Sequence, residues 1–137
     1  MSYHVGRLFD HVHLKVKDLA ASRRFYDAVL GSLGLPATQD FGEYAEADEL
    51  CLSKGTPLTG GLHLAFQAAD RQAVQRFHTA ALAAGGRDNG APGERHYHPG
   101  YYGAFALDPD GNNIEAVFHG PIERSAPSVV ITRVTEK

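Results

Sequence analysis

An internal repeat is the strongest constraint on what this chain can fold into. The segment HVHLKVKDLAASRRFYDAVLGSLG, which begins at His11, superposes without a gap on HLAFQAADRQAVQRFHTAALAAGG, which begins at His63. Eight positions are identical, among them the starting histidines, an aspartate seven residues later and the final glycine. Repeated segments of this kind are single supersecondary units, so the sequence predicts two copies of one module.

Each copy is predicted to be a strand followed by a helix. Apolar and polar residues alternate over 11–16 and again over 62–67, which is typical of a strand with one apolar face and one polar face. Asp18 and Asp70 then take the place of a helix N-cap, and apolar residues recur at helical spacing until a glycine ends each copy. The polar strand faces are inward or functional only if a partner group requires them there.

Further short strands are predicted after each helix. Residues 101–107 and 113–118 flank the strong turn sequence DPDGN, which indicates a β-hairpin. In the first half, residues 39–44 and 49–53 are the corresponding predicted strands. The patterns together predict an α+β fold of two strand–helix–strand–strand–strand modules.

Length and charge limit the kinds of partner. The 137 residues suit one domain, which we place at 1–124 with modules 8–55 and 60–121, followed by a polar tail at 125–137 that either adds an edge strand or stays mobile. A formal charge of −3 with no basic run argues against nucleic acid. Because no apolar stretch approaches the roughly 20 residues of a membrane span and no secretion signal begins the chain, a cytoplasmic protein with a small-molecule partner is expected.

The single cysteine is expected to be a packing residue. Cys51 stands between Leu50 and Leu52 in a strand-like run, which favours inert packing over a role as a nucleophile. A lone thiol cannot form an internal disulfide, and this also suits a reducing compartment.

Three residues on the polar strand faces form a candidate metal site. In a duplicated fold, His11 and His63 occupy equivalent positions, so their side chains could meet in one cleft between the modules. Glu115 lies on the last predicted strand, on the face opposite its apolar neighbours. Two imidazoles and a carboxylate suit divalent Zn, Fe, Mn or Ni, and three protein ligands leave positions open for a substrate oxygen.

Other polar residues near these strands have both a functional and a structural interpretation. His13 shares the face of His11 and is either a general base or a wall of the cavity. Tyr101 and Tyr102 alternate faces, so one should point into the cavity; we favour Tyr102, with core packing as the alternative for both. The loop 95–98 either covers the cleft with its cationic side chains or is simply exposed.

Three stretches resemble a known superfamily. The segment HVHLKVKDLAASRRFYDAVLGSLG is similar to the opening of glyoxalase, bleomycin-resistance and extradiol-dioxygenase domains, which form the vicinal oxygen chelate superfamily. The segment GAFALDPDGNNIEAVFHGP is similar to the closing hairpin of these domains, and GLHLAF lies between the two segments. The resemblance implies paired βαβββ modules that form an open, U-shaped mixed β-barrel around a divalent metal. Its ligands lie on the first strand of each module and the last strand of either, which match His11, His63 and Glu115.

One departure from the superfamily pattern bears on the reaction. Glyoxalase I enzymes usually take a fourth ligand from the last strand of the first module, where we place Leu50 or Leu52, and neither can bind a metal. The resemblance then favours the three-ligand pattern of the dioxygenase and fosfomycin-resistance branches.

Two functions from different classes follow. The first is a metal-dependent lyase, isomerase or dioxygenase acting on a small oxygen-rich substrate. The second is a bleomycin-resistance-like binding protein that encloses a small molecule without catalysis. The resemblance to this superfamily implies a homodimer in either case.

Overall fold

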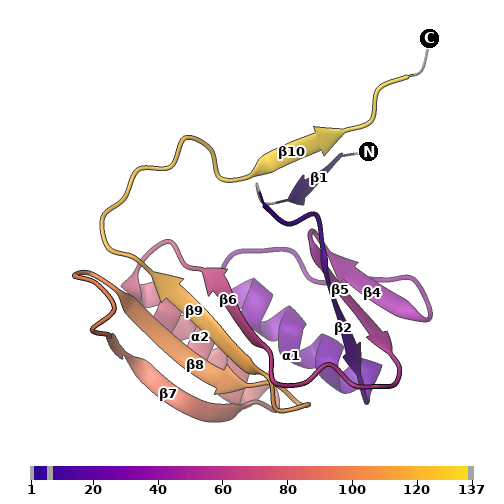
Figure 1. Ribbon diagram of the computed structural model, residues 1–137, viewed down its shortest axis with the longest axis horizontal. Helices are drawn as coiled ribbons and strands as arrows, with labels where there is room; N and C mark the ends of the chain where they lie inside the picture. The colour runs from indigo at the N-terminus through magenta and orange to yellow at the C-terminus, as the bar shows by residue number, and fades with distance from the viewer. Residues whose placement is uncertain (1, 6–7, 136–137) are drawn as a thin grey trace.

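The computed structural model describes residues 2–5 and 8–135, and it contains the two repeated modules side by side (Figure 1). In chain order the elements are β1 Ser2–Val5, β2 Val12–Val16, α1 Leu19–Ser32, β3 Gln39–Asp40, β4 Tyr44–Ala47, β5 Leu50–Lys54, β6 His63–Gln67, α2 Arg71–Ala83, β7 Arg87–Glu94, β8 Tyr102–Leu107, β9 Asn113–Phe118 and β10 Val129–Thr132. The predicted α+β fold is confirmed.

The two modules have the same sheet topology. One four-stranded sheet has the order β2-β5-β4-β3 and the other has the order β6-β9-β8-β7. In each sheet the module's first strand pairs parallel with its last strand, and the remaining pairs are antiparallel. Over the described residues the two sheets stay separate and do not close into a barrel. The arrangement is open, as predicted, and it consists of two distinct sheets.

Both helices begin where the sequence predicts. The Asp18 carboxylate accepts a hydrogen bond from the backbone N–H of Ala21 at 3.1 Å, and the Asp70 carboxylate accepts one from Ala73 at 2.7 Å. Each N-cap satisfies a helix donor that would otherwise be unpaired. The caps therefore fix the same strand-to-helix turn in both modules.

The core lies between the sheets and the helices. Helices α1 and α2 pack against each other and cover one face of the two sheets, and the opposite sheet faces remain open (Figure 1). The apolar residues of the strands point to the helices, as the alternation predicts. The larger fully buried core side chains are Leu14, Val16, Phe25, Tyr26, Val29, Leu52, Val74, Phe77 and Ile114.

One buried hydrogen bond ties the first module to the hairpin of the second. The hydroxyl of Tyr26, on α1, donates to Asp108 Oδ2 at 2.6 Å, and Asp108 Oδ1 accepts from the backbone N–H groups of Asp110 and Asn112. Burial, and then the charge of Asp108, raise the pKa of Tyr26 far above its usual value. The DPDGN turn therefore has a structural partner outside its own module.

The first-half strands differ from the prediction. We expected one strand over 39–44, and the structure instead has a two-residue strand β3, a turn at 41–43 and a separate strand β4. Gly42 has a φ of +87° there, and its N–H is bonded to the Asp40 carboxylate at 2.8 Å. Glycine adopts this positive φ without strain, so the chain turns here and the predicted strand is interrupted.

The polar tail contributes a strand, which was one of the two expected outcomes. Strand β10 pairs antiparallel with β1 to form a two-stranded sheet beside the two modules (Figure 1). Among the described residues, no helix is both long and apolar enough to pass through a lipid bilayer.

Candidate functional site

A buried carboxylate on the open face of the second sheet forms the centre of the candidate site. Glu115, on β9, is 1% exposed, although it lies on the face that the helices do not cover. Its Oε1 is 2.8 Å from Nε2 of His63 on the neighbouring strand β6, and its Oε2 accepts a hydrogen bond from the hydroxyl of Tyr101. Both carboxylate oxygens are thus held by side chains of the same module.

The local chain geometry explains why a carboxylate can be buried there. Gly103 lies beneath Glu115, and a Cβ at that position would be 3.0 Å from Glu115 Oε2. Phe105 is the direct cross-strand partner of Glu115, and its ring lies 5.8 Å from that of His63. The glycine provides room for the carboxylate, and Phe105 places its side chain on the same face of the sheet as the carboxylate.

The exposed members of this cluster are the imidazole and the phenol. The side chain of His63 is 53% exposed, and Tyr101 is half-buried. Burial, and then the hydrogen bond to Glu115, raise the pKa of Tyr101 well above its usual value, so that its hydroxyl keeps its proton. A carboxylate accepts hydrogen bonds, so a neutral His63 donates through Nε2–H and leaves the lone pair of Nδ1 unprotonated.

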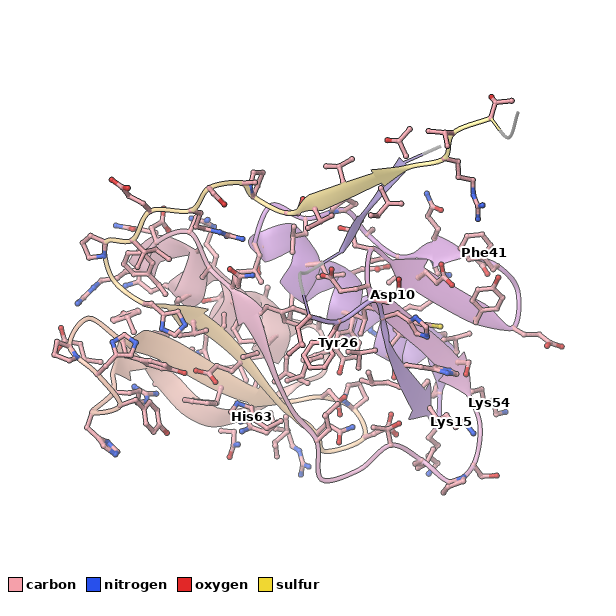
Figure 2. The ribbon with its side chains drawn as sticks, turned by 45° about the horizontal axis from the view of Figure 1, so that its top comes forward. Asp10, Lys15, Tyr26, Phe41, Lys54 and His63 are labelled. Carbon is pink, nitrogen blue, oxygen red and sulfur yellow. The ribbon has the colours of Figure 1, made fainter. Side chains whose placement is uncertain are left out.

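His11 is placed apart from this cluster. Its Nδ1 lies 2.7 Å from the Asp10 carboxylate, and both side chains are largely exposed. In Figure 2, Asp10 lies by the start of β2, whereas His63 lies on the second sheet. His11 has no contact with His63 or Glu115 among those found in the described residues.

The predicted three-ligand metal site therefore does not form within one described chain. The structure brings His63 and Glu115 together as predicted, but it does not bring His11 to them. The described residues contain no group of three or more His, Cys, Asp or Glu side chains that could hold a metal ion. Within one chain the structure brings together two of the three predicted ligands, so a divalent ion at His63 and Glu115 would need further ligands.

The tyrosine on the open face is Tyr101, whereas we favoured Tyr102. Tyr102 faces the helices: its hydroxyl accepts a hydrogen bond from the side-chain amide of Gln75 at 3.2 Å, and the Arg71 guanidinium lies 4.6 Å from its ring centre. Tyr101 has the same strand parity as Phe105, which is paired with Glu115. The sequence alone did not show which tyrosine shares the face of Glu115, because that choice depends on the register of β8 against β9.

His13 lies at a pocket on the first sheet. Its Nε2 is 2.6 Å from the Ser53 hydroxyl, so it occupies the open face of β2, as the alternation predicts. The pocket has a volume of about 580 Å³, and its wall is formed by His13, Leu19, Gly42, Glu43, Tyr44, Cys51, Ser53 and Lys54. Neither His63 nor Glu115 belongs to this pocket.

The register also corrects the position that we compared with a fourth ligand. Val12 pairs with Leu50 in the first sheet, as Leu64 pairs with Ile114 in the second. The first-module counterpart of Glu115 is therefore Cys51, rather than Leu50 or Leu52. Burial, and then the charge of Glu46, raise the pKa of the Cys51 thiol, so it stays protonated at neutral pH.

The loop before β8 is held by contacts of its own. The Arg95 guanidinium donates to the carbonyl oxygens of Ala91 and Glu94 and lies 5.4 Å from the ring centre of Phe105. Arg95 thus ties the loop to Phe105, the cross-strand neighbour of Glu115, while residues 96–99 are exposed, so a role of the loop in covering the site stays a prediction.

Comparisons with known proteins agree with this architecture. The chain is 34% identical to a glyoxalase/bleomycin resistance protein of Albidiferax ferrireducens T118, over 80% of this chain and 98% of that one, with a TM-score of 0.72. It shares 26% identity and a TM-score of 0.57 with the oxidase ChaP-H1, over 80% and 93% of the two chains. A glyoxalase-related enzyme of Fulvimarina pelagi, 21% identical over 93% and 99%, has the same fold with a TM-score of 0.69.

A search among curated proteins finds no match. The family model described as the Glyoxalase/Bleomycin resistance protein/Dioxygenase superfamily matches residues 8–116, which include the first module, most of the second, and Glu115. The chain therefore belongs to the glyoxalase/bleomycin resistance protein/dioxygenase superfamily.

Proposed function

We propose that this chain is an enzyme that acts on a small oxygen-rich substrate at the open face of the second sheet. The observation that carries the proposal is the 2.8 Å contact between His63 Nε2 and the buried Glu115 carboxylate. The relationship to glyoxalases and dioxygenases, and the likeness to the oxidase ChaP-H1, support a catalytic role for a small molecule.

His63 is the residue that moves a proton in this proposal. Its Nδ1 carries the free lone pair when Nε2–H donates to Glu115, and its ring is accessible to a ligand. A substrate C–H next to a carbonyl, or a substrate hydroxyl, gives its proton to Nδ1, and the electron pair stays on the substrate as an enolate or alkoxide. The resulting imidazolium is stabilised by the Glu115 carboxylate.

Glu115 is a positioning residue in this scheme. Its burial means that substrate contacts His63 rather than the carboxylate itself. Tyr101 holds the second carboxylate oxygen, so the orientation of Glu115 is fixed from both sides. This arrangement supports isomerase or lyase chemistry that starts with proton abstraction.

The experiment measures deuterium exchange at the α-carbon of small carbonyl compounds by NMR, with turnover of methylglyoxal hemithioacetal and catechols measured in parallel. The wild-type protein should accelerate at least one of these reactions. His63→Ala should abolish the acceleration, while His78→Ala, which alters a histidine bonded to Asp88, should leave it unchanged. Equal rates for wild type and His63→Ala would refute the proposal.

We also propose that the protein binds a divalent metal and forms a homodimer, and that the two properties depend on each other. Because His63 and Glu115 are the adjacent pair and His11 is exposed, a third ligand for a divalent ion would have to come from a second copy of the chain. Light scattering and metal analysis of protein purified without nickel resin test both: a dimer that holds more metal per chain than His11→Ala and His63→Ala do supports them. A metal-free monomer contradicts them.

A second candidate function is small-molecule binding without catalysis. It is favoured by the pocket of about 580 Å³ on the first sheet, a size ordinary for small ligands. In that case Tyr44→Ala should weaken binding of a small apolar drug measured by calorimetry, and His63→Ala should not. Loss of binding in His63→Ala alone would place the ligand on the second sheet instead.

A further inference from the structure

We propose that His98 and His119 form a second site, separate from His63 and Glu115, that binds a divalent ion of the zinc, nickel and copper class. His98 lies in the loop between β7 and β8, and His119 directly follows β9. Nε2 of His98 and Nδ1 of His119 are 2.8 Å apart, and the two rings are stacked at 21° with centroids 5.1 Å apart.

The hydrogen bonds define which nitrogen carries each proton. Nδ1 of His98 lies 2.9 Å from the carbonyl oxygen of Pro99, and a carbonyl can only accept, so Nδ1 of His98 is the donor. In the neutral ring its Nε2 then has a lone pair, and it accepts from Nδ1–H of His119. Nε2 of His119 is left unprotonated.

A single proton therefore joins two basic nitrogens. If His119 changes tautomer, both nitrogens present lone pairs to each other at 2.8 Å, which is repulsive unless a cation lies between them. Neutral imidazole nitrogen is a preferred ligand of Zn²⁺, Ni²⁺ and Cu²⁺. The same two atoms that share a proton can thus share a metal ion.

The distance is close to what an ion requires. With Zn–N bonds of about 2.0–2.1 Å and a tetrahedral angle, two nitrogen ligands lie about 3.3 Å apart. The two nitrogens need to move apart by about half an ångström, and the rings need to turn so that both lone pairs point at the ion. Both histidines are exposed, so water can occupy the remaining coordination positions.

Backbone glycines bring the two histidines together. Gly100 and Gly120 have φ of +89° and +90°, and a Cβ on Gly120 would be 3.3 Å from the Cα of Gly100. A Cβ on Gly100 would be 3.1 Å from the carbonyl oxygen of His119. These positions favour glycine both for conformation and for the close approach of the two segments. The site is therefore built by the fold rather than by the chance meeting of two flexible side chains.

An ion at this site would also fix the tyrosine of the neighbouring cluster. The ring of Tyr101 packs edge-on against His98 and His119, with centroids at 5.3 and 5.2 Å, and its hydroxyl donates to Glu115. Holding the two imidazoles together limits the movement of Tyr101. The metal would thus stabilise the loop over the second-sheet cluster without coordinating it.

The test is a Zn²⁺ titration of untagged protein purified without nickel resin and stripped with chelator, followed by calorimetry and by NMR of the ¹⁵N-labelled imidazoles. The ring signals of His98 and His119 should shift together on zinc addition. His98→Gln and His119→Gln should each lower the affinity of this site by about tenfold or more. His96→Gln, which changes a neighbouring exposed histidine, is the matched control and should retain the affinity.

The outcomes separate this site from the proposed active site. Zinc binding at His98 and His119 that persists in His63→Ala supports the inference whatever that variant does to turnover. Zinc that shifts only the signals of His63 or His11, or binds His119→Gln as tightly as wild type, overturns it. Thermal unfolding without zinc verifies that each variant folds.

Discussion

The two copies of the module begin with a histidine at the same position, but the two histidines have different partners. His63 contacts the buried carboxylate of Glu115, whereas His11 contacts the exposed carboxylate of Asp10. The position equivalent to Glu115 is Cys51, which pairs with His13 across the ladder. Duplication places a histidine at the start of both repeats. Only the second repeat forms a candidate site, because only the second module has a carboxylate, Glu115, at this position of its last strand.

Substitutions at the two equivalent histidines, His63 and His11, should have the largest and most unequal effects. His63→Ala should lower the turnover described above by about 10²- to 10⁴-fold, the usual contribution of a general base. His11→Ala should leave turnover nearly unchanged if one chain supplies the whole site. Parallel kinetics of the two variants measure the difference. Equal losses would mean that His11 reaches the site through a second copy.

The next effect concerns another pair of equivalent positions, Tyr26 and His78. Tyr26 donates to buried Asp108 in the other module, whereas His78 contacts surface Asp88 in its own. Tyr26→Phe should lower the free energy of unfolding by about 1.5–3 kcal/mol, as for other hydrogen bonds to charged groups. His78→Ala should cost less, because water screens the Asp88 contact. Urea unfolding of the two variants measures both, and equal costs would contradict the ranking.

The same tyrosine sets a sign for the pH dependence of stability. The pKa of Tyr26 is raised in the folded state, so the folded protein holds this proton more tightly than the unfolded chain does. Stability from this group is complete below about pH 10, the pKa of an unfolded tyrosine, and falls as the pH rises above it. Unfolding measured from pH 8 to 11 should be less sensitive to pH in Tyr26→Phe than in wild type.

Much of the fold was predictable because its signals are local. The alternation over 11–16 and 62–67, the caps Asp18 and Asp70, and the DPDGN turn each act within a few residues. The turn at 41–43 was missed because one glycine outweighed a weak strand pattern. The pairing of β10 with β1 joins the two ends of the chain, which no local pattern determines.

The candidate site was predictable only in part because it depends on strand register. His63 and Glu115 were predicted from alternation and are adjacent in the structure. The choice between Tyr101 and Tyr102, and the match of Cys51 to Glu115, each turn on a shift of one residue, and one residue reverses the face of a strand. The placement of His11 depends on how the modules pack, which the repeat alone does not specify.

The two helix N-caps should contribute equally to stability, because their geometry is the same in both modules. Asp18→Ala and Asp70→Ala each remove a helix N-cap and should each lower the free energy of unfolding by about 1 kcal/mol. Because the two caps bond the same position of their helices, the losses should agree within experimental error. Urea denaturation compares them, and a marked difference would show that one module depends more on its helix.

The smallest effect is expected at Cys51, the counterpart of Glu115. Its thiol is partly buried in the ladder opposite His13, and burial together with the charge of Glu46 raises its pKa, so that it stays protonated. Cys51→Ala should therefore leave turnover unchanged and cost about 1 kcal/mol of stability or less, as for loss of a small, partly packed side chain. Reaction of the wild-type thiol with a disulfide reagent should be slow at pH 7 and accelerate only above the pKa of an ordinary cysteine. Rapid modification at neutral pH, or loss of turnover in Cys51→Ala, would mean that the first module has a reactive centre of its own and that the two copies differ less than their partners suggest.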